Sequence, residues 1–284
     1  MKVNKIAVAL GLTSAIVIAG CDSGSSSSSS STPSSTTYSV KAIDGYLRNA
    51  KVWLDINRDF LHDEGTEPSA ITGEGGVAEL DVSDIPNYQD YQLVVQVIAG
   101  ETIDEDTINV QNPAGDVMES GKVMSAPAGE SNVTPLSSDV NSIMLQHPGA
   151  LENPEQQEQL KQRVKMEVAA FWGVDPESIF GDYLEEGKED MRAAFIAQSI
   201  VKSGQVLPES PEEMSQLALE IQQAGESANE DVPARKLAEA VNEKIKRVVE
   251  TTDEDDLANT PAPVLPPEEG TTPPDDDADG VPNA

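Results

Sequence analysis

Oxygen-bearing side chains recur at a fixed spacing in the segment 55–67, in a pattern that can wrap a cation. Carboxylates and one amide occupy positions one, three, five and nine, and a backbone carbonyl would fill position seven. Calcium is a hard ion that takes six to eight oxygen ligands at about 2.3–2.6 Å, which such a segment can supply. The candidate calcium ligands are Asp55, Asn57, Asp59, Leu61, Asp63, Glu64 and Glu67.

The sequence around this segment resembles a known family. The resemblance is carried by three runs, Asp44-Gly45-Tyr46-Leu47, Ala50-Lys51-Val52-Trp53-Leu54-Asp55-Ile56-Asn57 and Asp63-Glu64-Gly65-Thr66-Glu67-Pro68. They are similar to the calcium-loop segment of the prealbumin-like sandwiches in bacterial surface proteins, the SdrD B-like and carboxypeptidase-regulatory-like domains, over roughly residues 40–100. The resemblance implies an antiparallel β-sandwich that carries a calcium loop.

Two positions depart from the pattern of that family. Phe60 stands at position six, where a glycine is expected, and Thr66 displaces the acid of position twelve to Glu67. A loop of this type can still close through Glu64 or a repositioned Glu67. We expect a calcium affinity in the extracellular range, about 0.1–1 mM. The alternative is a solvated acidic turn without a metal.

A shorter pattern of the same kind lies near Gly280. This match covers only ten residues. It resembles one thrombospondin type-3 calcium repeat, without an acid at position twelve. The weaker second set of candidate metal ligands is Asp275, Asp277, Asp279, Val281 and Asn283. The alternative is a plain acidic tail, because the segment 251–284 is acidic, rich in proline and predicted to be disordered.

The N-terminal segment 1–20 has the features of an export signal. Lys2 and Lys5 precede an apolar run that is too short to span a bilayer. The run ends in Ile18-Ala19-Gly20-Cys21, which resembles the lipobox of bacterial lipoproteins and implies a covalent lipid on Cys21. This cysteine is the only one in the sequence, so it cannot form a disulfide within the chain. The alternative is an ordinary secretory peptide with an incidental cysteine.

A lipid on Cys21 would anchor the protein to a membrane without crossing it. The segment 21–37 is rich in serine, which predicts a flexible tether with a reach of about 20–25 Å. Asp22 directly follows Cys21 and resembles the inner-membrane retention signal of enterobacterial lipoproteins, a rule that is not uniform across bacteria. We favour the outer membrane or cell surface of the bacterial envelope over the periplasmic face of the inner membrane.

The charge of the chain limits its partners. Two of the 18 basic residues precede Cys21, whereas all 51 acidic residues follow it, which leaves a formal charge of about −35. Such a surface repels nucleic acid and anionic lipid head groups. We therefore expect no nucleic acid partner, and a basic surface or a divalent cation instead.

The segment 38–133 is predicted to be a β-domain. Short runs rich in β-branched residues and bounded by turn residues predict strands near 40–46, 52–54, 77–80, 93–98 and 107–110, with a turn at 47–49. Their spacing favours a small antiparallel sandwich.

The segment 134–250 is predicted to be a helical domain. At four places a residue that can cap a helix is followed by a proline, which suits the first helical position. These prolines are Pro135, Pro154, Pro176 and Pro211. Apolar stripes at helical spacing follow, and they suit a compact bundle of about five helices, although a groove for a partner has the same pattern. The expected fold class is therefore α+β in two domains, with the sandwich first.

Catalytic motifs are missing from the sequence. Only His62 and His147 could serve as imidazole bases, and no H-E-x-x-H, G-x-S-x-G or phosphate-loop motif occurs. We expect a non-enzymatic envelope lipoprotein whose calcium-stabilised sandwich presents the helical domain to a protein or a surface polymer. The alternative is an accessory or docking subunit of an envelope complex without a metal role, and a remote alternative is an enzyme of unknown type.

Overall fold

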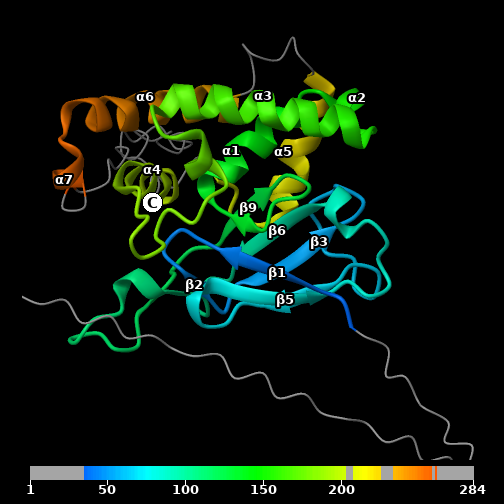
Figure 1. Ribbon diagram of the computed structural model, residues 1–284, viewed down its shortest axis with the longest axis horizontal. Helices are drawn as coiled ribbons and strands as arrows, with labels where there is room; N and C mark the ends of the chain where they lie inside the picture. The colour runs from blue at the N-terminus through cyan, green and yellow to red at the C-terminus, as the bar shows by residue number, and fades with distance from the viewer. Residues whose placement is uncertain (1–34, 203–206, 225–232, 258–259, 261–284) are drawn as a thin grey trace, which may run out of the picture. The chain divides into compact units, whose positions relative to one another are not determined.

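The computed structural model describes residues 35–202, 207–224, 233–257 and 260. Strands dominate its N-terminal part and helices follow, so the expected mixed α+β fold is confirmed (Figure 1). None of the helices in these ranges has the length and apolar character needed to span a bilayer. The signal segment 1–20, Cys21 and the second set of candidate metal ligands, 275–283, lie outside the described residues.

The strands of the described part form three small sheets. The first has the order β10-β1-β5, the second β2-β7-β8 and the third β4-β3-β6-β9. The bounds are β1 Thr37–Ala42, β2 Leu47–Arg48, β3 Lys51–Asp55, β4 Ser69–Ile71, β5 Val77–Asp81, β6 Gln92–Val97, β7 Ile103–Asp104, β8 Asp116–Val117, β9 Lys122–Ala126 and β10 Asn132–Val133. All pairs are antiparallel except β1 with β10, which is parallel.

The third sheet is the most deeply buried. Consecutive residues of β3, Val52, Trp53 and Leu54, are all buried, so both faces of this strand are covered. In β1 and β5 buried residues alternate with more exposed ones, as expected for strands with one face toward solvent. Strand β5 packs against β3 and β4, while helix α1 (Pro135–Met144) packs against β9. The third sheet therefore lies between the first sheet and the helices.

The remaining helices follow α1 along the chain. They are α2 Pro148–Leu151, α3 Pro154–Trp172, α4 Met191–Lys202, α5 Pro211–Ala224, α6 Pro233–Thr251 and α7 Glu254–Leu257, with short 3₁₀ helices η1 Glu74–Gly76, η2 Tyr88–Asp90, η3 Glu105–Thr107 and η4 Pro176–Ile179. Helix α1 contacts both β9 and α3, and Figure 1 shows it between them.

Capping side chains are present at the four helix starts that the sequence predicts. The four prolines at the predicted starts each occupy a first helical position, although Pro176 begins a 3₁₀ helix. At the start of α1, Thr134 Oγ1 accepts a hydrogen bond from the backbone N–H of Ser137 at 2.9 Å. Ser137 Oγ in turn accepts from the backbone N–H of Thr134 at 2.8 Å, which completes a capping box.

Three local predictions differ from the structure. Leu47–Arg48 is strand β2 rather than a turn, and the segment 107–110 contains no strand. Instead, Asp104 caps η3 by accepting from the backbone N–H of Asp106, because a short acidic side chain competes with the strand ladder for backbone donors. The segment predicted to be a tail from residue 251 includes α7, and Leu257 is buried in the core.

The buried side chains form one cluster that includes strands and helices, for example Val95 of β6 and Val140 of α1. The division into separate domains at residue 133 and the sandwich arrangement of the sheets stay predictions.

Polar side chains connect α1 to the third sheet inside this core. Asn141 Nδ2 donates to Gln92 Oε1 and to Ser125 Oγ, both at 3.0 Å. Ser138 Oγ accepts from the backbone N–H of Ser125 at 2.9 Å, so the helix pairs directly with the edge strand β9. All four residues are buried, where an unpaired polar group would be costly.

Asn141→Ala should destabilise the protein by about 1–3 kcal/mol, because it leaves Gln92 Oε1 and Ser125 Oγ without their buried donor. Urea denaturation measures the change. Ser142→Ala is the matched control on the same helix, and it should alter the free energy of unfolding by less than about 0.5 kcal/mol. Equal effects of the two substitutions would contradict a stabilising role of the network.

Candidate calcium site in the loop after strand β3

The candidate loop begins where strand β3 ends. Asp55 is the last residue of β3 and is paired across the sheet with Gln92 of β6. Strand β4, which begins at Ser69, pairs with β3 on its other side. Because β3 is hydrogen-bonded to both neighbours, the position of Asp55 is fixed, and the loop spans one end of the third sheet.

Asp55 is buried, and its carboxylate accepts hydrogen bonds. Its exposed fraction is 0%, and Oδ2 accepts from Gln92 Nε2 at 2.6 Å and from the backbone N–H of Phe60 at 2.9 Å. Burial raises the pKa of Asp55 to about 6, while these two hydrogen bonds act to lower it. A cation beside Asp55 would oppose the effect of burial, because a nearby positive charge favours the carboxylate.

The side chains at positions three, five and nine converge. Asn57 Nδ2 donates to Asp59 Oδ2 at 3.0 Å and to Asp63 Oδ2 at 3.1 Å. Asn57 Oδ1 accepts from the backbone N–H of Asp59 at 3.0 Å, and Asp59 Oδ1 accepts from that of Leu61 at 2.8 Å. The structure therefore brings these three side chains together, with an amide hydrogen-bonded to two carboxylates.

The two glutamates of the loop differ in environment. Glu67 is buried, and its Oε1 and Oε2 accept from the backbone N–H groups of Ile56 at 2.7 Å and Asp63 at 3.0 Å. Its side chain therefore holds the two ends of the loop together, and it would have to share an oxygen to bind an ion. Glu64 is exposed.

Two loop residues adopt a left-handed backbone conformation. The φ angle is 62° at Arg58 and 64° at Phe60. Such a conformation costs a side chain of this size on the order of 1–3 kcal/mol. Phe60 thus adopts at position six the conformation that favours glycine. Its buried ring contributes about 1.5–3 kcal/mol, enough to offset that strain.

The loop fits a calcium ion in part. It provides a buried first carboxylate, three converging side chains and a left-handed residue at position six. In the part of the chain that the structure describes, no three histidine, cysteine or acidic side chains are grouped so that they could hold a metal ion. Two of the candidate ligands, the Asn57 amide and the Leu61 carbonyl, are neither histidine, cysteine nor acidic side chains, so they do not count toward a group of that kind. Calcium binding by this loop stays a prediction.

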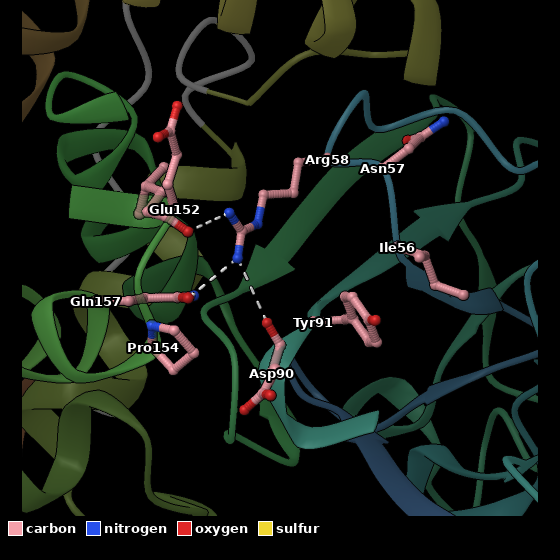
Figure 2. Close-up of a pocket in the computed structure, with 9 residues that line it drawn as sticks. Ile56, Asn57, Arg58, Asp90, Tyr91, Glu152, Pro154 and Gln157 are labelled. Atoms are coloured by element: carbon pink, nitrogen blue, oxygen red, sulfur yellow. Dashed lines mark hydrogen bonds between the residues drawn. The ribbon is translucent and has the colours of Figure 1, made fainter. Parts of the chain in front are cut away.

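Arg58 extends from the loop toward the helices (Figure 2). Its guanidinium donates to the Leu151 carbonyl, to Gln157 Oε1 at 3.0 Å and to the Asp90 carbonyl at 3.4 Å. A pocket of about 320 Å³ lies beside it, lined by polar and apolar residues of the loop, of η2 and of the ends of α2 and α3. Burial lowers the pKa of Arg58, whereas the negative charge of Asp55 acts in the opposite direction.

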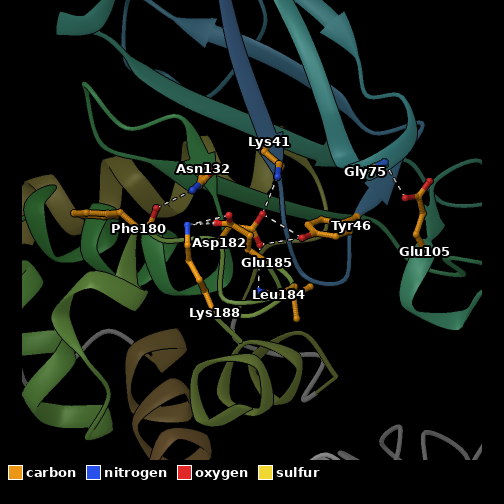
Figure 3. Close-up of polar contacts among 10 residues, drawn as sticks. All are labelled: Lys41, Tyr46, Gly75, Glu105, Asn132, Phe180, Asp182, Leu184, Glu185 and Lys188. Carbon is orange, nitrogen blue, oxygen red and sulfur yellow. Dashed lines mark hydrogen bonds and ion pairs between the residues drawn. The ribbon is translucent and has the colours of Figure 1, made fainter. Parts of the chain in front are cut away.

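A second polar junction joins strand β1 to the segment after η4 (Figure 3). Lys41 Nζ lies 2.7 Å from Asp182 Oδ2, and the Tyr46 hydroxyl lies 3.1 Å from both oxygens of that carboxylate. Burial and the negative charge of Asp182 raise the pKa of Tyr46 to about 12, so the hydroxyl stays a donor. Arg58 and Asp182 thus connect the strand-rich part to the part of the chain after β10 at separate places.

A group of aspartates surrounds the turn between β1 and β2. Asp44 is 6% exposed, and its Oδ1 has no hydrogen-bond partner among the described residues. A Cβ atom on Gly45 would lie 2.0 Å from Asp104 Oδ1, so only glycine permits this close approach. Burial raises the pKa values of Asp44 and Asp104, and burial together with the charge of Asp104 raises that of Asp106 to about 6.

Sequence patterns did not identify these contacts between distant residues. Gln92 lies 37 positions after Asp55, and Asp182 lies 141 positions after Lys41. No local spacing links such pairs, because strand pairing and helix packing bring them together.

Asp44→Asn should stabilise the protein when no calcium is present. The folded state holds protons on these aspartates more tightly than the unfolded state, so stability should fall as pH rises from about 4 through 6 and above. In chelator at pH 7.5, the variant should raise the unfolding midpoint by about 2–4 °C, the shift for 1 kcal/mol in a protein of this size, and flatten the pH dependence. The exposed Asp84→Asn is the control, and a lower midpoint for Asp44→Asn would contradict the prediction.

Comparison of the sequence and the structure with known proteins finds no similar protein. No family model matches the chain, and no curated protein and no solved structure matches it. The function proposed below therefore rests on the residues and geometry described above.

Proposed function

We propose that this protein is a non-enzymatic lipoprotein of the bacterial cell envelope whose β-domain is stabilised by calcium and presents its helical part to a partner. The strand-rich part would be the sandwich implied by the family resemblance, with calcium in the loop after β3. The partner would be a protein or a surface polymer that tolerates an acidic surface. Nucleic acid would be repelled by the excess of acidic residues.

The convergence of Asn57, Asp59 and Asp63 carries the calcium part of the proposal. Like charges held close together repel unless a donor or a cation lies between them, and here the Asn57 amide takes that place. A bound calcium ion would take oxygen ligands from these side chains, from buried Asp55 and from the Leu61 carbonyl. The ion would supply no chemistry beyond charge and fixed geometry.

The lipid part of the proposal rests on the sequence around Cys21. Each buried methylene of an acyl chain contributes about 0.8 kcal/mol, so more than one chain gives stable attachment. The serine-rich tether would then hold the folded part within a few nanometres of the membrane. We favour the outer membrane or cell surface.

Asp59→Ala should weaken calcium binding but change the stability of the calcium-free protein little. Asp59 is half-buried, and these hydrogen bonds join it only to residues two positions away. Calorimetric titration of the wild type should find one ion with a dissociation constant of about 0.1–1 mM. At 100 times that concentration, calcium should stabilise the wild type by about 2.7 kcal/mol.

Glu79→Ala is the matched control, since it removes one exposed acid from β5, away from the loop. It should leave the titration unchanged. If the wild type gives neither heat nor a shift of the unfolding midpoint at several millimolar calcium, the metal role is wrong, and a docking subunit without a metal becomes the better description.

Cys21→Ala should abolish membrane attachment. After phase separation in a mild detergent, the wild type should enter the detergent phase and the variant the aqueous phase, because the variant cannot carry the acyl chains. Ser23→Ala keeps the cysteine and is expected to behave as the wild type. A wild-type protein found in the aqueous phase, with the signal segment removed, would contradict lipidation.

A further inference from the structure

Arg58 occupies an unusual place in the candidate loop. It lies between Asn57 and Asp59, two of the candidate ligands, yet its own side chain turns away from them. Figure 2 shows Arg58 and Asn57 extending in opposite directions, with the guanidinium directed at Gln157. The backbone conformation at Arg58 is left-handed, with φ of 62°, and this conformation sets the direction of its side chain.

The contacts of Arg58 join three elements that are distant in the sequence. One N–H group donates to the Leu151 carbonyl at the end of α2, and others donate to Gln157 Oε1 of α3 and to the Asp90 carbonyl of η2. Gln157 is buried and Arg58 is half-buried, so solvent does not fully replace these bonds when they break. The planar guanidinium is suited to donating in several fixed directions at once.

We propose that Arg58 couples cation binding in the loop to the packing of α2 and α3 against the β-domain. The inference rests on the proposed function, since it takes the loop to bind calcium. An ion held by Asn57 and Asp59 restrains the backbone on both sides of Arg58. That restraint keeps the left-handed conformation, and with it the direction in which the guanidinium points.

The coupling has a defined thermodynamic form. Without an ion, the strained conformation at Arg58 competes with other backbone conformations in which the guanidinium does not reach Leu151. An ion that binds only the ordered loop shifts this equilibrium toward the state in which the contacts with α2 and α3 are made. By linkage, loss of those contacts must weaken calcium binding by the same factor.

Electrostatics alone predict the opposite change. Arg58 lies near the carboxylate of Asp55, and the acids Asp90 and Glu152 also line the adjacent pocket. Removal of a positive charge beside the loop would strengthen calcium binding by Coulomb attraction. Arg58→Lys separates the two effects, because it keeps the charge and loses the planar arrangement of donors.

Hydrogen exchange, measured on the full chain in chelator and in excess calcium, tests the coupling. In the wild type, calcium should slow exchange in β3 and β6 and also in residues 148–160, by roughly 5- to 150-fold if the coupling is of ordinary size. In Arg58→Lys, calcium should still slow exchange in β3 and β6 but have little effect on residues 148–160. Calorimetry of this variant should find weaker calcium binding.

Arg163→Lys is the matched control, because Arg163 is an exposed residue of α3 away from the loop. It should behave as the wild type in both measurements. The inference is overturned if Arg58→Lys keeps the calcium effect on residues 148–160 while β3 and β6 respond normally. If the wild type does not respond to calcium anywhere, the proposed function fails as well, so the two failures are distinguishable.

Discussion

A buried carboxylate, that of Asp55, is the constraint on which the arrangement of this protein depends. Removing a charge from water is costly unless it is paired or hydrogen-bonded. Here Gln92 and the backbone N–H of Phe60 donate to it, and Gln92 in turn accepts from Asn141 of α1. Three features therefore contribute to the hydrogen bonding of this one carboxylate: the turn of the loop, the pairing of β3 with β6 and the packing of α1 on the sheet. The hydrogen bonds of Asp55 thus link the local structure of the loop to the packing of the core.

The same loop reaches the helices by a second path. Asp55 connects inward through amides to α1, whereas Arg58 connects outward to α2 and α3. On another side, the ion pair of Lys41 with Asp182 joins β1 to the segment after η4. Order in the loop is thus tied to the position of the helices. If calcium binds this loop as proposed, such ties would let the ion determine how firmly the helical part is held.

Local patterns in the sequence predicted the features that depend on nearby residues. The helix starts at Pro135, Pro154 and Pro211 and the strand at Val52 follow from capping chemistry and β-branched runs, and the structure has them. The pattern failed at residues 107–110, where the cap from Asp104 outweighs strand propensity.

Features that depend on tertiary contacts could not be predicted in this way. The spacing of Asp55 and Asn57 suggests a loop for an ion, but it does not reveal that Gln92 holds the first carboxylate or that Arg58 points at α3. Nor does it reveal that Phe60 can take a left-handed conformation because its ring is buried in the core. These features arise only when the sheet and the helices meet.

Calcium binding in the segment 55–67 can be tested most directly by a crystal structure of the protein grown in millimolar calcium. If calcium binds as proposed, the ion will have oxygen ligands from Asp55, Asp59, Asp63 and the Leu61 carbonyl, and Asn57 will present its oxygen to the ion. If the Asn57 amide instead still donates to Asp59 and Asp63, with no ion between them, the loop is a hydrogen-bonded acidic turn and the proposed calcium site is wrong.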